Sequence, residues 1–74
     1  MLYLQPSSLQ YKFHRAVWDG KTEKKALELL TVQPTTARSW QRRLRERAAR
    51  SLGQSVAEVN YVRALRCLFE GESA

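Results

Sequence analysis

Hydrophobic residues recur three or four positions apart along most of the chain, which is the spacing of a helix with one buried face. Glycine and proline interrupt this pattern at points that divide the chain into four segments. We therefore predict helices over residues 8–18, 22–30, 34–52 and 55–69. Because a chain of 74 residues makes one domain, the expected fold is a single all-α domain.

The ends of these segments carry residues suited to helix boundaries. Capping residues stand before three of them, namely Ser7 or Ser8, Thr22 and Ser55. Pro34 suits the first position of the third helix, where a backbone N–H has no partner in any case. Only residues 31–34 separate the second and third helices, and so short a joint makes them cross, as in a helix-turn-helix unit.

The predicted third helix has an apolar face and a polar face when it is drawn at about 100° per residue. The apolar face holds Ala37, Trp40, Leu44, Ala48 and Leu52. The opposite face holds Thr35, Arg38, Ser39, Arg42, Arg45 and Ala49. We expect the apolar face to pack against the first two helices, which leaves the other face to solvent or to a partner.

Positive charge is concentrated on this same segment. The chain has 13 Lys+Arg and 7 Asp+Glu, a net charge of +6. Between Thr35 and Leu52 there are six arginines and one acid, Glu46, a balance of +5. Most charged runs are merely solvated helix faces, and an acidic membrane or protein would also suit this one. Arginine without lysine, and without mixed signs, favours contact with nucleic acid.

The position along the helix divides the basic residues into two groups. The N-terminal half of a recognition helix reaches base edges in the major groove, and its flanks meet phosphates. We assign base reading to Thr35, Arg38, Ser39 and Arg42. We assign phosphate binding to Lys21, Lys24, Arg43, Arg45, Arg47 and Arg50.

Residues 7–48 also follow the pattern of a known family. The matching residues are Gly20-Lys21-Thr22, Ala26-Leu27 with Leu30, Val32, Pro34, Thr36-Ala37 and Leu44. In these positions the chain resembles the helix-turn-helix of the LuxR/GerE family of bacterial transcription regulators. The resemblance implies a four-helix domain, with a three-helix core and a C-terminal dimerisation helix, that binds a two-fold symmetric operator. The family's base-reading positions fall on the four residues assigned above.

The chain departs from the family pattern at several positions. Lys25 stands where the second helix usually has glutamate, Gln10 where the first helix favours glutamate, and Trp40 where the third helix usually has histidine. The stretch from Thr36 to Gly71 is longer than in compact members. Sigma-factor region 4 and other trihelical regulators share much of the same pattern.

The predicted fourth helix is apolar over more than half of its circumference, whereas a helix on the surface of a monomer needs only a stripe. A homodimer would bury the surplus, and its symmetry would match a palindromic site. The expected interface consists of Val59, Tyr61, Val62, Leu65, Leu68 and Phe69. Alternatively, the N-terminal residues 1–4 fold over this helix and cover it.

The sequence gives little support for a disulfide, a metal site or a catalytic site. One cysteine and one histidine can form neither a disulfide nor a zinc site within a single chain. We expect His14 at the surface or partly packed, and Cys67 in the core or an interface. No residues stand at the spacing of an activated nucleophile and its base. No segment resembles a secretion signal or approaches the roughly 20 apolar residues of a membrane span. We therefore expect a cytoplasmic protein that is not an enzyme and needs no cofactor.

The leading hypothesis is a sequence-specific DNA-binding transcription regulator that acts as a homodimer on double-stranded DNA. The alternative is a protein-interaction module, whose basic helix docks an acidic partner such as RNA polymerase or another regulator. RNA binding is less favoured, because the chain lacks the aromatic pattern of single-strand readers.

Overall fold

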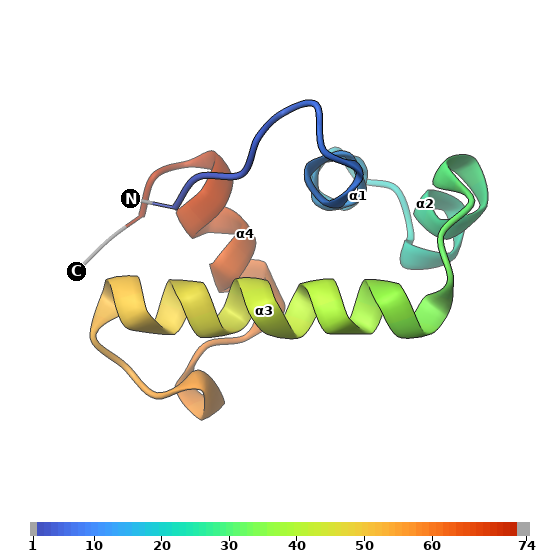
Figure 1. Ribbon diagram of the computed structural model, residues 1–74. Coiled ribbons are helices and arrows are strands. Elements are labelled where there is room, and N and C mark those ends of the chain that lie inside the picture. The colour runs from blue at the N-terminus through green and yellow to red at the C-terminus, as the bar shows by residue number, and fades with distance from the viewer. Residues whose placement is uncertain (1, 73–74) are drawn as a thin grey trace. The chain divides into compact units, whose positions relative to one another are not determined.

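The computed structural model describes residues 2–72, which form four α-helices, one 3₁₀ helix and no strand (Figure 1). The elements are α1 (Leu9–Trp18), α2 (Glu23–Leu30), α3 (Pro34–Leu52), η1 (Val56–Glu58) and α4 (Tyr61–Phe69). The prediction of an all-α fold is confirmed for this part of the chain. No helix within it is long and apolar enough to cross a membrane.

These elements group into two compact units. The first unit is residues 4–40, with α1, α2 and the beginning of α3. The second unit consists of residues 2–3 and 41–72, with the rest of α3, η1 and α4. Helix α3 therefore begins in one unit and ends in the other, and each unit is described by itself below.

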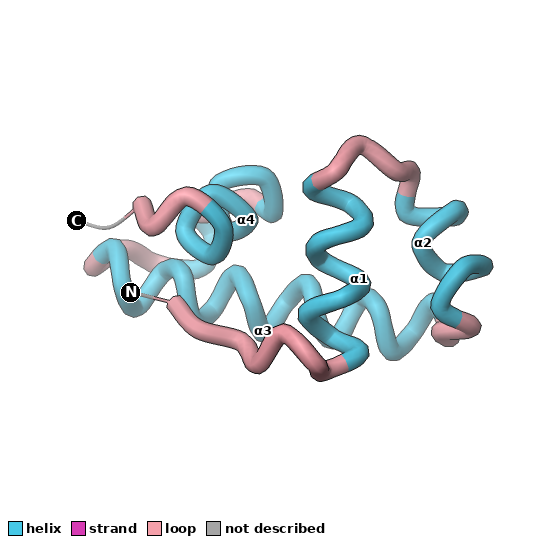
Figure 2. Tube along the Cα trace, turned by 90° about the horizontal axis from the view of Figure 1, so that it is seen from above, coloured by secondary structure: helices cyan, strands magenta, loops and turns pink. Residues whose placement is uncertain are grey.

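In the first unit, side-chain caps define the starts of α1 and α2. The Ser8 hydroxyl accepts a hydrogen bond from the Tyr11 amide at 3.1 Å, and the Thr22 hydroxyl accepts one from the Lys25 amide at 3.1 Å. Helix α1 ends before Gly20, whose φ of +100° lies in the region that glycine adopts without strain. The two helices lie side by side and are joined by residues 19–22 (Figure 2).

Each helix of the first unit contributes one fully buried apolar side chain to its core. These are Phe13 from α1, Ala26 from α2 and Ala37 from α3. Six partly buried residues pack around them, namely Ala16, Val17, Leu27, Leu30, Val32 and Trp40. The rings of Phe13 and Trp40 lie 5.9 Å apart between centroids, which is a favourable aromatic separation. The beginning of α3 is therefore anchored through Ala37 and Trp40.

His14 also lies in the interior of the first unit, so the expectation of a surface or partly packed position is wrong. Its side chain is fully buried and its ring packs edge-on against Phe13, with 5.6 Å between centroids. Burial disfavours the charged imidazolium and lowers the pKa of His14 to about 4. The sequence carried no sign of this position, because a polar residue beside Phe13 does not extend the apolar pattern.

In the second unit, α3 ends at Leu52 and the chain turns at Gly53, which has a φ of +68°. The turn is closed by the amide of Gln54, which donates to the carbonyl oxygen of Ala49 at 2.9 Å. The core of this unit comprises Leu2, Leu44, Ala48, Ala49, Leu52, Val59, Ala64, Leu65 and Cys67. The predicted apolar face of α3 is thus buried. Its part after Trp40 packs in the core of the second unit, whereas the sequence predicted packing against the first two helices.

The continuous helix predicted over residues 55–69 is wrong, because the chain forms η1 first and α4 only from Tyr61. The N-cap of α4 is Asn60, whose side-chain oxygen accepts a hydrogen bond from the Arg63 amide at 2.8 Å. Ser55, the predicted cap, caps no helix with its side chain; its hydroxyl instead lies 3.3 Å from a carboxylate oxygen of Glu58.

Arg45 holds the segment between α3 and α4 in place. Its Nε donates to the carbonyl oxygen of Val59 at 2.8 Å, and its Nη2 donates to that of Val56 at 3.1 Å. Val56 is the first residue of η1 and Val59 directly follows it, and this single short turn pairs few of its own backbone groups. A guanidinium keeps its charge and several donors at any physiological pH, so it suits this position. The hydrogen bonds fold residues 56–59 back along α3, and Val59 enters the core.

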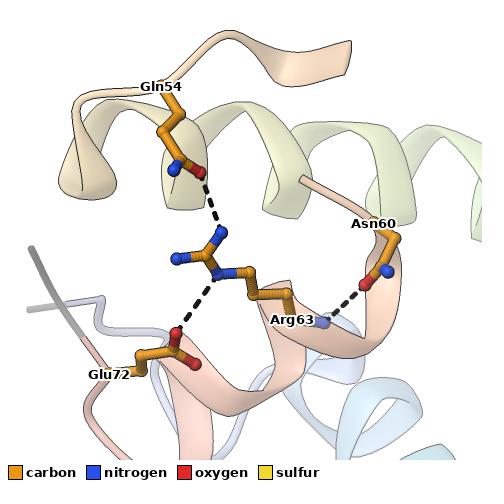
Figure 3. A network of polar contacts seen from close by, with 4 residues as sticks. All are labelled: Gln54, Asn60, Arg63 and Glu72. Carbon is orange, nitrogen blue, oxygen red and sulfur yellow. Dashed lines mark hydrogen bonds and ion pairs between the residues drawn. The ribbon is translucent and has the colours of Figure 1, made fainter. Parts of the chain in front are cut away.

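A second arginine, Arg63, makes polar contacts with residues on both sides of α4 (Figure 3). The Nε of Arg63 lies 3.2 Å from a carboxylate oxygen of Glu72, and its Nη1 donates to the side-chain oxygen of Gln54 at 2.9 Å. Arg63 thereby links the turn after α3 to the segment that follows α4. Asn60, which accepts from the Arg63 amide, completes this network, and all four residues belong to the second unit.

Protonation of His14 is expected to destabilise the fold. The folded-state pKa of about 4 lies below the value near 6.5 in an unfolded chain, so added protons bind the unfolded state more tightly. Stability should be full above pH 6.5 and should fall as the pH drops from 6.5 toward 4, by up to ~3 kcal/mol. Urea denaturation at several pH values would measure the slope. His14→Phe should flatten it between pH 5 and 6.5, and an unchanged slope would contradict the assignment.

Loss of the Arg45 hydrogen bonds is expected to destabilise the second unit. Arg45→Ala leaves the carbonyls of Val56 and Val59 without their charged donor, which should lower the free energy of unfolding by about 2 kcal/mol. Arg43→Ala is the control, because this neighbouring arginine is exposed, and its effect should stay below about 0.5 kcal/mol. Urea denaturation of both variants gives the comparison. Equal effects would show that Arg45 has no special structural role.

Candidate nucleic-acid interface

The surface of α3 carries four arginines that make no hydrogen bond or ion pair within residues 2–72. These are Arg38, Arg42, Arg43 and Arg50, and all four are exposed. The remaining two arginines of the helix, Arg45 and Arg47, are half-buried and donate hydrogen bonds inside the chain. The arginine run of the sequence therefore divides into two side chains that donate hydrogen bonds within the chain and four that do not.

The turn before α3 determines which of its residues reach the surface. The amide of Val32 donates to the carbonyl oxygen of Leu27 at 3.0 Å and closes the end of α2. Thr31 adopts the left-handed conformation (φ 56°, ψ 51°), which a β-branched residue rarely does. Helix α3 then starts at Pro34, and with Ala37 buried in the core, the adjacent Arg38 faces outward.

All four residues predicted to read bases are exposed on the first nine residues of α3. They are Thr35, Arg38, Ser39 and Arg42. Arg38 and Arg42 stand four residues apart, so their side chains lie on the same side of the helix, about one turn from each other. Their guanidinium groups can each donate two parallel hydrogen bonds to a planar acceptor such as guanine or phosphate.

The six residues predicted to bind phosphate have different surroundings. Lys21, Lys24, Arg43 and Arg50 are exposed. Arg47 is half-buried, and its Nη2 donates to the carbonyl oxygen of Tyr3 at 2.9 Å. Arg45 is a structural residue, and its assignment to phosphate needs correction because the segment around η1 folds back onto it. Ala49, placed by the pattern on the same outward face, is buried as well.

The residues predicted to form a dimer interface differ in how far they are exposed. Val59 and Leu65 lie in the core of the second unit and offer no surface to a partner. Tyr61, Leu68 and Phe69 are half-buried. Val62 is 58% exposed. Much of the apolar surplus that suggested a dimer is therefore buried within one chain, together with Leu2 from the N-terminal segment.

Two hollows in the surface had no counterpart in the sequence analysis. One, of about 400 Å³, lies at the joint of α2 and α3, between Lys24, Leu27, Glu28, Thr31, Val32, Gln33 and Pro34. The other, of about 430 Å³, lies between Leu2, Arg47, Arg50 and Ser51. No periodic pattern could reveal the second hollow, because Leu2 meets residues more than forty positions away in the chain.

Metal chemistry has no support in this part of the chain. Among residues 2–72, no three histidine, cysteine, aspartate or glutamate side chains lie together as a metal site requires. Cys67 is buried, and its burial raises the pKa of the thiol. A protonated, buried thiol is a poor nucleophile and a poor metal ligand.

Comparisons of the chain with models of protein families, with curated proteins and with solved structures find no match.

Proposed function

We propose that this protein is a sequence-specific DNA-binding transcription regulator that inserts the beginning of α3 into the major groove. The proposal is carried by one observation: Arg38 and Arg42 are exposed one turn apart near the start of α3 and bind nothing within residues 2–72. A short turn joins α3 to α2, as in a helix-turn-helix unit. In such units the second helix enters the groove with its N-terminal residues against the bases.

Base reading then falls to Arg38 and Arg42, with Thr35 and Ser39 beside them. Arginine pairs bidentately with O6 and N7 of guanine, and hydroxyl groups can serve as donor or acceptor to several bases. The same two arginines repel each other in the free protein, since like charges four residues apart on a helix are unfavourable. Insertion between two rows of phosphates removes that repulsion, which adds to the favourable energy of binding.

Phosphate contacts are proposed for the exposed cations around this segment. Arg43 and Arg50 continue along α3, Lys24 lies in the first turn of α2, and Lys21 directly precedes the N-cap of that helix. In helix-turn-helix units the helix before the recognition helix crosses the DNA backbone, which suits these lysines. Such contacts fix the register of the protein on the duplex and carry no sequence information of their own.

The resemblance to LuxR/GerE regulators supports the same function and adds a homodimer on a two-fold symmetric operator. Because Val59 and Leu65 belong to the core, a dimer contact would centre on Val62 with the half-buried residues near it on α4. The dimer remains a prediction that rests on this smaller surface and on the resemblance. RNA polymerase or an accessory regulator is the further partner that this type of function implies.

A second candidate function is favoured by the hollow at the joint of α2 and α3. Its apolar wall includes Leu27 and Val32, and Lys24 lines it as well. Leu29 on α2 is 66% exposed. Lys24 and Glu28 give the hollow one charge of each sign, so it suits an apolar segment of a partner protein, and the chain would then be a protein-interaction module. Selection of sequences from a random duplex pool separates the two, because only the regulator enriches a motif.

Replacement of the proposed base-reading arginines should reduce both affinity and sequence preference. Arg38→Ala or Arg42→Ala should cost ~1–3 kcal/mol on the selected site and relax the choice of base at one position. Lys12→Ala is the control, because Lys12 is exposed on α1 and the variant loses the same charge. Fluorescence anisotropy with selected and scrambled duplexes at several salt concentrations gives affinity, preference and salt dependence together.

The salt series tests the electrostatic part of the proposal. The logarithm of the wild-type affinity should fall with the logarithm of salt concentration by ~0.9 for each phosphate contacted. Circular dichroism should show that each variant keeps its helices, because the replaced side chains are exposed. A flat salt dependence, or an Arg38→Ala variant with unchanged preference and affinity, would contradict DNA recognition by α3.

A further inference from the structure

The hollow between Leu2, Arg47, Arg50 and Ser51 has the composition of an anion site. Arg47, Arg50 and Ser51 follow one another at spacings of three and one along α3, so they share one side of the helix. Arg47, Arg50 and Ser51 therefore line the hollow from one side of the helix, and Leu2 lines it from the N-terminal segment. No acidic side chain lines the hollow within residues 2–72, so the two positive charges have no counter-charge there.

Contacts within the second unit hold part of this site in place before any ligand binds. The Nη2 of Arg47 donates to the carbonyl oxygen of Tyr3 at 2.9 Å, which orients the guanidinium and uses only one of its five N–H donors. Leu2 is buried, so the wall that it provides is part of the core. Arg50 is exposed and has no partner among the described residues, so it can turn toward a ligand.

We propose that this hollow binds a phosphate group, with Arg47 and Arg50 as its cationic partners and Ser51 as an additional donor. Guanidinium groups match phosphate geometry through two parallel hydrogen bonds, and these charge-assisted bonds are stronger than those between neutral groups. The phosphate could be a phosphodiester of a nucleic-acid backbone, in which case the site rests on the proposed function. It could also be a phosphomonoester of a small ligand, whose charge of about −2 balances the two arginines.

The site can be tested without DNA. Inorganic phosphate and, separately, dimethyl phosphate would be titrated into the whole protein at constant ionic strength. NMR signals of the Ser51 amide and of the arginine Nε groups report binding. We expect a saturable shift of these signals with at least one of the two probes. Arg50→Gln should weaken that binding about tenfold, because it removes a charge-assisted pair.

The matched control is Arg66→Gln. Arg66 is an exposed arginine on α4 in the same unit, so this variant loses the same charge at a different place. Arg50 is preferred to Arg47 for the test, because replacing Arg47 would also break its bond to Tyr3. Circular dichroism checks that both variants are folded. The absence of saturation with both probes, or equal weakening by Arg50→Gln and Arg66→Gln, would overturn the phosphate site.

The source of the phosphate follows from a third measurement, on duplex DNA. A backbone phosphodiester is indicated if dimethyl phosphate binds and Arg50→Gln reduces the salt dependence of duplex binding by about one unit. A phosphomonoester is indicated if only inorganic phosphate binds and duplex binding is the same in the variant. A protein that binds phosphate in the hollow but no duplex would overturn the proposed function and leave this site standing.

Discussion

The hydrogen bonds of the Arg45 guanidinium to the carbonyl oxygens of Val56 and Val59 determine the course of the chain after α3. They hold η1 against the helix and bring Val59 into the core. Helix α4 then begins at Tyr61, with Asn60 as its N-cap, and its buried residues pack within the same unit. Because η1 occupies residues 56–58, α4 is shorter than the predicted fourth helix, and the burial of Val59 and Leu65 reduces the apolar surface left for a dimer.

The arginines of α3 differ in role. Arg45 and Arg47 donate to backbone carbonyls, so their charges contribute to the fold. Arg38, Arg42, Arg43 and Arg50 remain exposed without an acidic partner in the described chain. Several like charges close together on one helix oppose folding through their repulsion, and a bound polyanion relieves it. The proposed function depends on this second group.

Local patterns in the sequence predicted the parts of the fold that local interactions determine. Ser8 and Thr22 cap helices as expected, and α1, α2 and α3 begin and end within one residue of the predicted bounds. Arg45 could not be told from Arg42, because its partners lie eleven and fourteen residues away and leave no periodic signal. The burial of His14 and the hollow beside Leu2 likewise depend on tertiary packing. Exposure of the four proposed base-reading residues was predictable, because α3 is amphipathic at its start.

We propose that exposed arginines of α3 bind DNA while the Arg45 guanidinium keeps its hydrogen bonds to the carbonyl oxygens of Val56 and Val59. The most direct test follows the arginine Nε–H signals by NMR while duplex DNA is added to the ¹⁵N-labelled protein. The signals of Arg38, Arg42, Arg43 and Arg50 should shift. The signal of Arg45 should not shift, because its Nε–H donates a hydrogen bond to the carbonyl oxygen of Val59. A shift of the Arg45 signal as large as that of Arg38, or no shift of any arginine signal, would contradict this account.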